Sequence, residues 1–237
     1  MQQIIGHRGA AGYAPENTMA SFEKAYALGC RFIEFDVMLS ADNEAFIFHD
    51  ETLERTTNGQ GDFGLSTSEY LQSLDAGSWF SKEFAGEKIP TLLDAIHWLV
   101  KREVHANIEI KPYPGFTRQT TQAVLEHIEN YWPKEKPLPL VSSFCHDALA
   151  ICREQSKDLP LGLLLDKWQD NWLELAKAYR CTSVHLSRRI ATASRVLEIK
   201  RHGYIVYVYT VNRERLALKL QSFGVDALFS DYPDLLS

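Results

Sequence analysis

Basic character, paired cysteines and long apolar runs are all scarce in this 237-residue chain. Its formal net charge is −6 and its pI is near 5.8. This balance argues against nucleic acid or an anionic membrane surface as a main partner, because both attract basic faces. The four cysteines include no C-x-x-C pair, so no disulfide framework is expected. No apolar run approaches the roughly 18 residues of a membrane span, and we expect no stable membrane association.

The start of the chain also lacks a feature, namely the basic segment and apolar stretch of a secretory signal. Met1-Gln2-Gln3 passes directly into the run Ile4-Ile5-Gly6, which favours a soluble, cytoplasmic protein. With 45% hydrophobic and 24% charged residues, the chain is long enough to bury one core. We therefore expect a single domain over residues 1–237.

Short apolar runs alternate with longer segments of helical period, which predicts βα units and a parallel sheet. The eight predicted strands are Gln3 to Gly6, Phe32 to Leu39, Asn107 to Ile110, Leu140 to Ser143, Gly162 to Leu165, Ser183 to Leu186, Ile205 to Tyr209 and Ala227 to Phe229. Helices are predicted to start near Thr18, Thr91, Thr117, His146, Asn171, Ala193 and Asn212, the last as an N-cap. This α/β pattern favours a (β/α)8 TIM barrel whose last helix is missing or displaced, since residues 234–237 are too short for one. A doubly wound open sheet is the alternative.

Residues 50–90 interrupt the alternation. They are rich in glycine and carry the aromatics Tyr70, Trp79, Phe80 and Phe84, whereas a βα loop usually has about 2 to 6 residues. We interpret them as a small inserted lobe after the second strand region, with aromatics packed over the rim of the barrel. A surface excursion without function is the alternative interpretation.

Three acidic residues are predicted to face the barrel interior. Glu34 and Asp36 are two apart on one strand and so point to the same side, and Glu109 repeats the pattern on the next barrel strand. Adjacent carboxylates repel, and oxygen ligands without a histidine or cysteine cluster favour one hard divalent cation, Mg²⁺ or Ca²⁺. The alternative for each acid is a buried ion pair with Arg8 or Lys111.

Histidines and cations complete the candidate site. His7 and His49 each end an apolar run, and a pair of this kind fits a general base and a general acid on opposite sides of a phosphorus centre. Arg8 and Lys111 offer donors for the nonbridging phosphate oxygens. Strand ends of a barrel meet at one rim, so these segments are predicted to converge there. A lone histidine at a strand end is more often structural, and it is the pairing that favours catalysis.

The ordered motifs of the chain resemble those of the glycerophosphodiester phosphodiesterases, especially the bacterial cytoplasmic members associated with glycerol phosphate uptake. The resemblance covers nearly the whole chain. The motifs are Gly6-His7-Arg8-Gly9, Ala14-Pro15-Glu16-Asn17-Thr18, Ile33-Glu34-Phe35-Asp36-Val37, the segment from His49 to Gly59, Asn107-Ile108-Glu109-Ile110-Lys111, Ser142-Ser143-Phe144, Tyr209-Thr210-Val211-Asn212, Gly224-Val225-Asp226 and Ser230-Asp231.

This resemblance implies a barrel with an inserted lobe and the hydrolysis of deacylated phospholipids, such as glycerophosphocholine or glycerophosphoethanolamine, to sn-glycerol 3-phosphate and an alcohol. It implies one divalent cation, Mg²⁺ or Ca²⁺, as cofactor and a small-molecule substrate as partner. Carried over by residue, the acid–base pair is His7 and His49, the metal ligands are Glu34, Asp36 and Glu109, and the phosphate contacts are Arg8 and Lys111.

Two positions depart from the family pattern. Many relatives have Trp where Tyr209 stands and Thr where Ser230 stands. Tyr209 is expected to line the glycerol side of the pocket, with ordinary barrel packing as the alternative. Other functions remain open, namely a lysophospholipase D-type reaction on the same scaffold or a non-catalytic phosphate-binding barrel.

Overall fold

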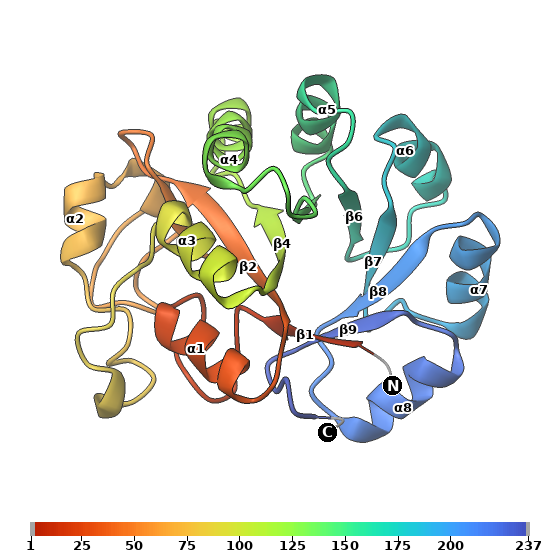
Figure 1. The fold of residues 1–237 in the computed structure, drawn as a ribbon, viewed down its shortest axis with the longest axis horizontal. Helices are drawn as coiled ribbons and strands as arrows, with labels where there is room; N and C mark the ends of the chain where they lie inside the picture. Colours follow the sequence, from red (N-terminus) through yellow and green to blue (C-terminus); the bar gives the residue numbers. More distant parts are fainter. Residues whose placement is uncertain (1–2, 236–237) are drawn as a thin grey trace.

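The chain folds into a closed barrel of parallel strands with helices around it (Figure 1). The computed structural model describes residues 3–235. Its strands are β1 (Gln3–His7), β2 (Phe32–Leu39), β3 (Ala45–Ile47), β4 (His105–Ile110), β5 (Leu140–Ser143), β6 (Leu161–Leu165), β7 (Ser183–Ser187), β8 (Ile205–Tyr209) and β9 (Ala227–Ser230). Its helices are α1 (Met19–Ala27), α2 (Ser68–Ser73), α3 (Leu92–Arg102), α4 (Thr117–Tyr131), α5 (His146–Gln155), α6 (Trp172–Ala178), α7 (Ala193–Arg201) and α8 (Glu214–Ser222), with short 3-10 turns η1 (Phe63–Leu65) and η2 (Lys82–Phe84).

Eight of these strands close the barrel. They pair in parallel in the order β1-β2-β4-β5-β6-β7-β8-β9, and β9 returns to β1 with Ile5 opposite Phe229. The predicted (β/α)8 barrel is therefore confirmed, and the open sheet is excluded. Seven helices, α1 and α3 to α8, connect the strands in turn, and none forms over residues 231–235 after β9. The rest of the segment judged too short for a final helix, residues 236–237, lies outside the described residues.

Capping side chains explain where several helices begin. Thr18 accepts a hydrogen bond from the amide of Ser21 at the start of α1, and Thr91 forms a reciprocal capping box with Asp94 at the start of α3. The prediction that Asn212 caps the last helix is wrong. Helix α8 begins at Glu214 after Arg213, because the Asn212 side chain is engaged elsewhere, as described below.

The segment between β3 and α3 has an apolar centre of its own. Strand β3, which the sequence pattern did not predict as a strand, lies antiparallel to β2, with Met38 opposite Phe46. After it, Phe63 stacks on Phe48 with ring centroids 4.6 Å apart. These rings pack with buried aliphatic side chains of the same segment. Helix α2 of this segment lies on the outer side, away from the barrel centre (Figure 1).

Two further apolar clusters stabilise the barrel. The larger one fills the space between the strands and the surrounding helices. The smaller one, which includes Ile5, Phe32, Leu140 and Phe229 from four different strands, packs among the barrel strands. Burying this apolar surface is the main favourable term in folding, and it leaves the polar strand ends to form a site.

Candidate functional site

The carboxyl ends of β1, β2 and β4 bring the predicted site residues together. His7 is the last residue of β1 and lies opposite Glu34 of β2, while Asp36 lies opposite Glu109 of β4. Lys111 directly follows β4. Parallel pairing therefore places residues that are up to about a hundred positions apart in the sequence on one rim.

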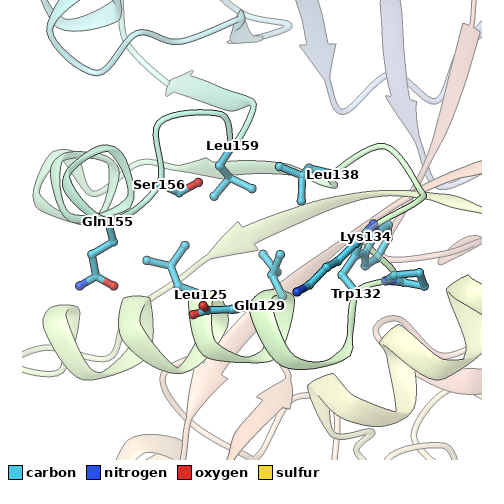
Figure 2. A pocket seen from close by; sticks show the side chains of 10 residues that line it. Leu125, Glu129, Trp132, Lys134, Leu138, Gln155, Ser156 and Leu159 are labelled. Carbon is cyan, nitrogen blue, oxygen red and sulfur yellow. The ribbon is translucent and has the colours of Figure 1, made fainter.

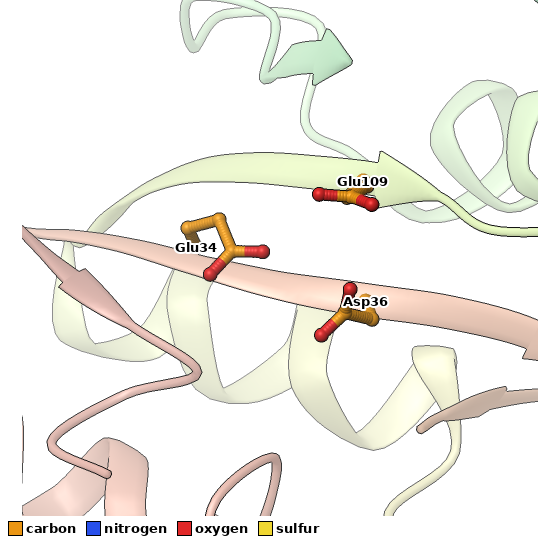
Figure 3. A group of neighbouring side chains, drawn as sticks. All are labelled: Glu34, Asp36 and Glu109. Atoms are coloured by element: carbon orange, nitrogen blue, oxygen red, sulfur yellow. The ribbon is translucent and has the colours of Figure 1, made fainter. Parts of the chain in front are cut away.

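Three carboxylates converge inside this rim. Glu34, Asp36 and Glu109 each offer an oxygen within 4.8 Å of the others, and all three side chains are buried (Figure 3). Burial and the neighbouring charges of Asp36 and Glu109 raise the pKa of Glu34 well above its usual value. Burial and the charge of Asp36 raise the pKa of Glu109 to about 8. Glu34 and Glu109 therefore bind protons more strongly than isolated carboxylates do, as expected for buried groups beside a like charge.

The two cations proposed as ion-pair partners both lie beside one member of this cluster. Arg8 Nε is 3.3 Å and Lys111 Nζ is 4.0 Å from Asp36. Burial alone would raise the pKa of Asp36, but Arg8 and other cations hold it at about 2. Within residues 3–235, neither the Glu34 nor the Glu109 carboxylate has a cationic side chain within 4 Å. The three buried carboxylates, of which Glu34 and Glu109 have no cationic side chain beside them, form a set of oxygen ligands that fits a hard divalent cation.

Arg8 reaches the cluster from a tight turn after β1. Its backbone has a positive φ of 51°, and its amide donates to Glu34 at 3.0 Å. A Cβ at Gly6 would lie 2.4 Å from the carbonyl oxygen of Gly9, so the turn requires glycine at this position. Arg8 Nη1 donates to Glu16 at 2.5 Å, whereas Nε is buried without a hydrogen-bond partner. The guanidinium keeps one buried donor for a further acceptor.

Each of the two histidines donates through Nδ1 to a carboxylate. His7 donates to Asp231 Oδ1 at 2.6 Å, and His49 donates to Asp50 Oδ1 at 2.5 Å. Burial alone would raise the pKa of Asp231, but its hydrogen bond from His7 lowers it. An ionised carboxylate only accepts, so Nδ1 carries the proton and Nε2 is the acceptor nitrogen of each ring.

The two histidines differ in their surroundings. Lys111 Nζ donates to His49 Nε2, and burial lowers the pKa of His49. His7 instead borders an open polar hollow of about 390 Å³, which is also lined by Asp166, Arg188 and Tyr209. The Tyr209 hydroxyl is buried without a partner, its ring meets Phe144 edge-on at 5.8 Å, and burial raises its pKa. Tyr209 is therefore beside the site as well as packed against the barrel interior.

Several polar residues of this rim had no predicted role or a different one. Asn212, expected as a helix cap, donates to Asp231 Oδ2 and accepts from the amide of Asp231 at 3.0 Å. Arg55, which had no predicted role, binds both Glu16 and Asp50. Asp231 follows the last strand and Asp50 follows His49, so position at a strand end was a usable signal for both. Arg55 carried no such signal.

An apolar hollow of about 310 Å³ lies between α4 and α5, lined by Leu125, Trp132, Leu138 and Leu159 among others (Figure 2). It is formed by the ends of helices that lead into strand beginnings, so it belongs to the opposite end of the barrel from the carboxylates. Barrel enzymes carry their active sites at the carboxyl ends of the strands.

No helix within residues 3–235 is long and apolar enough to cross a membrane.

Known proteins with the same motifs match the chain over almost its full length. The model of the glycerophosphoryl diester phosphodiesterase family matches residues 7–235. A glycerophosphodiester phosphodiesterase of Caldanaerobacter subterraneus is 33% identical over 237 residues, covering 98% of this chain and 95% of the relative. A phosphodiesterase of Oleispira antarctica, solved in complex with its product sn-glycerol 3-phosphate, superimposes with a TM-score of 0.95 at 40% identity, covering 98% of this chain and 94% of that one. The chain belongs to the glycerophosphoryl diester phosphodiesterase family.

Proposed function

We propose that this chain hydrolyses glycerophosphodiesters to sn-glycerol 3-phosphate and a free alcohol, with a divalent cation as cofactor. The observation that carries this proposal is the meeting of three buried carboxylates with two carboxylate-bound histidines on one rim. Family membership and the product bound in the Oleispira antarctica relative support the reaction class. The substrates we expect are deacylated phospholipids with small polar alcohols, such as glycerophosphocholine and glycerophosphoethanolamine.

The proposed metal ligands are Glu34, Asp36 and Glu109, which would hold Mg²⁺ or Ca²⁺. When bound, the cation would supply positive charge for the phosphate and increase the acidity of the glycerol 2-hydroxyl. The repulsion among the three carboxylates, seen in the raised pKa of Glu109, supports a bound cation because it would relieve this repulsion.

The proposed phosphate contacts are Arg8 and Lys111. Arg8 Nε forms no hydrogen bond in the free protein, although it lies 3.3 Å from Asp36, and a phosphate oxygen would accept one from it. Arg8 can donate through its fork of N–H groups, whereas Lys111 acts as a point charge. Tyr209 would line the polar hollow beside His7 that receives the glycerol end of the diester.

The proposed acid–base pair is His7 and His49. One histidine takes the proton of the glycerol 2-hydroxyl, which attacks phosphorus to give a five-membered cyclic phosphate. The other histidine protonates the departing alcohol, and water then opens the ring with the two roles reversed. The carboxylate on each Nδ1 fixes the tautomer, so that Nε2 is the nitrogen that exchanges the proton. For His49, Lys111 would first have to move from Nε2, to which it donates in the free protein, to a phosphate oxygen.

We also propose that the barrel and the insertion over residues 50–90 form one domain. The packing of Phe63 in the insertion against Phe48 and Phe46 supports this. A lysophospholipase D-type reaction would need an apolar groove at the catalytic rim, and the apolar hollow between α4 and α5 belongs to the other end of the barrel. A non-catalytic phosphate-binding barrel would not need both histidines and all three carboxylates.

The test is to remove metal from the purified protein, add back Mg²⁺ or Ca²⁺, and measure sn-glycerol 3-phosphate released from glycerophosphocholine and glycerophosphoethanolamine. Metal-dependent release from both is the expected result. Release of phosphocholine and glycerol without sn-glycerol 3-phosphate would place scission on the other side of phosphorus and contradict the proposal. No release with either ion would favour the alternatives, namely lysophospholipid substrates or a non-catalytic binding role.

The cyclic route has a separate test. A diester that lacks the vicinal hydroxyl cannot form the ring, so it should be a very poor substrate while glycerophosphocholine is cleaved normally. Rapid cleavage of such a compound at the same site would rule out the cyclic phosphate and leave direct attack by water.

A further inference from the structure

Arg55, in the first turn of the insertion, is clamped between two carboxylates. Its Nε and Nη2 donate to Asp50, the latter at 2.9 Å to Oδ1, while Nη1 and Nη2 donate to Glu16 at 2.8 and 2.7 Å. Four of the five N–H donors of the guanidinium are therefore used, two on each acid. This is a paired bidentate arrangement, which gives geometric specificity that a single ion pair does not.

Both acids hold a second partner that belongs to the proposed chemistry. The Asp50 oxygen that accepts from Arg55 at 2.9 Å also accepts from His49 Nδ1 at 2.5 Å. The Glu16 oxygen that accepts from Arg55 at 2.7 Å also accepts from Arg8 Nη1 at 2.5 Å. One guanidinium thus connects the carboxylate behind a histidine with the carboxylate behind the phosphate-facing arginine.

The turn that carries Arg55 is fixed by its own contacts. Leu53 is fully buried in the apolar centre of the insertion, and its amide donates to Gly61 at 3.0 Å. Thr57 returns a backbone and a side-chain hydrogen bond to the carbonyl of Leu53, at 3.1 and 2.7 Å. Arg55 therefore reaches across to the rim from a supported backbone, which suits a residue that holds other side chains in position.

Simple stabilisation of the fold does not explain this arrangement well. The Arg55 side chain is 45% exposed, and exposed ion pairs contribute little to stability. Asp50 and Glu16 would repel each other without the cation between them. Burial alone would raise the pKa of Asp50, but hydrogen bonds from Arg55 and His49 hold it below its usual range. Removing Arg55 should therefore free both acids to turn away from His49 and Arg8.

We propose that Arg55 is a positioning residue for the hydrolysis, acting on His49 through Asp50 and on Arg8 through Glu16; this inference rests on the function proposed above. It gives the insertion a role, because the insertion supplies the group that links the β3 side of the rim to the turn after β1. Since general acid–base transfer depends on placement of the imidazole, and phosphate binding depends on Arg8, loss of Arg55 affects both kcat and KM.

The kinetic test compares Arg55→Ala and Arg55→Lys with the parent enzyme. Loss of supporting hydrogen bonds around a site typically costs 10- to 100-fold, so Arg55→Ala should lower kcat/KM by about that factor, with kcat reduced and KM raised. Lysine is a point charge and cannot bind both carboxylates in bidentate fashion, so Arg55→Lys should recover only a small part. Guanidinium ion at millimolar concentration should partly restore Arg55→Ala, since the site is open to solvent.

Two single-acid variants separate the branches of the network. Asp50→Asn should mainly lower kcat, because it acts on His49, and Glu16→Gln should mainly raise KM, because it acts on Arg8. Arg102→Ala is the matched control. Arg102 donates to both oxygens of Glu23 at 2.9 and 3.2 Å between α3 and α1, away from the rim, and its loss should leave kcat and KM unchanged.

A readout without substrate keeps this test independent of the reaction. Imidazole ¹⁵N shifts of His49 should report the Nδ1–H tautomer in the parent and in Arg102→Ala, and a mixture of tautomers in Arg55→Ala. The positioning role is overturned if Arg55→Ala keeps the parent tautomer together with kcat and KM within a factor of two, or if Arg55→Lys restores both constants fully. An inactive parent enzyme would instead reject the proposed function, and the tautomer measurement would still decide the role of Arg55.

Discussion

At the scale of single residues, the carboxylate cluster combines charges that disfavour each other. Glu34 and Glu109 are buried beside Asp36. Of these three carboxylates, Asp36 alone has a cationic side chain within 4 Å among the described residues. Replacing one of these carboxylates by an amide removes repulsion in the metal-free protein. It also removes a ligand oxygen with full negative charge, so stability and cation binding should respond in opposite directions.

Glu109→Gln should therefore be more stable than the parent without metal and should lose the stabilisation given by Mg²⁺ or Ca²⁺. At a hundredfold excess over Kd, a bound ion stabilises the native state by about 2.7 kcal/mol, or about 5 to 10 °C in Tm for a domain of this size. Thermal unfolding with and without cation measures both effects. Glu126→Gln, an exposed change on α4, is the control, and a full cation-induced rise in Glu109→Gln would remove Glu109 from the metal site.

The histidines give a second prediction at this scale. His7→Ala or His49→Ala should lower kcat by about 10²-fold or more, because each imidazole transfers a proton in the proposed reaction. Folding should remain intact, since both side chains lie at the rim and only partly buried. His97→Ala on the exposed face of α3 is the control. A normal rate in either variant, measured with saturating metal, would take that histidine out of the mechanism.

The ease with which these residues could be predicted depends on whether their partners are local in sequence. Alternation on one strand was enough to pair Glu34 with Asp36, and strand ends were enough to group them with Glu109 and His7. Arg55 could not be placed, because its contacts with Glu16 span 39 positions and depend on how the insertion folds back. Tertiary contacts of irregular segments follow no periodicity that a sequence displays.

At the scale of elements, α3 shows how a local signal fixes a boundary. Thr91 Oγ1 accepts from the amide of Asp94 at 3.1 Å, and Asp94 accepts from the amide of Thr91 at 3.1 Å. The preceding Pro90 carbonyl accepts from the amide of Ile47 at 2.8 Å. This start of α3 therefore closes the insertion against β3, while the helix itself contributes no residue to the candidate site.

Thr91→Ala should lower the free energy of unfolding by about 1 kcal/mol, because one donor at the helix start loses its acceptor. Thr91→Ser should retain most of the stability, since serine can cap in the same way. Urea unfolding measures the difference, and kcat/KM should stay at the parent value in both variants. A fall in kcat/KM without a change in stability would show that the cap acts on the site rather than on the helix.

Element boundaries that are supported by a cap and a long periodic pattern were predicted closely. Boundaries that depend on a short pattern, or on a residue with two competing roles, were not. Strand β3 has three residues, too few for alternation to be detected, and it pairs with the last residues of β2. Asn212 looks like a cap because asparagine favours that position. Its amide instead satisfies Asp231, so the tertiary hydrogen bond overrides the local preference.

At the scale of the whole molecule, the barrel separates a charged rim from an apolar interior that nevertheless contains one buried histidine, His185 on β7. Its Nε2 lies 2.8 Å from Ser183 Oγ, its Nδ1 has no partner, and it packs against the rings of Tyr207 and Phe229. Gly162 makes room for it, since a Cβ there would lie 2.5 Å from Nε2. Burial lowers the pKa of His185 to about 3.

This neutral histidine should make the stability of the whole barrel depend on pH in a defined window. Below about pH 6.5 the unfolded chain binds a proton at His185 that the native chain does not, so stability is complete above that pH and falls as pH decreases toward 3. The slope from one such group is about 1.4 kcal/mol per pH unit, which amounts to about 2 kcal/mol between pH 6.5 and pH 5. Glu34 and Glu109, whose pKa values are raised in the folded protein, contribute in this window with the opposite sign. The contribution of His185 is therefore isolated by comparing the parent with a variant at that position alone.

His185→Leu should lack this loss of about 2 kcal/mol between pH 6.5 and pH 5 relative to the parent, because leucine fills a similar volume and binds no proton. Urea unfolding at half-unit steps from pH 6.5 to pH 5, at constant cation concentration, measures the slope in parent and variant. The lowered pKa of His49 contributes equally to both proteins and cancels in the comparison. His97→Leu, which changes an exposed histidine on α3, should keep the parent slope. An equal slope in His185→Leu would mean that the buried imidazole accepts its proton without unfolding the barrel, and the acid sensitivity of the fold would then have to arise at the charged rim.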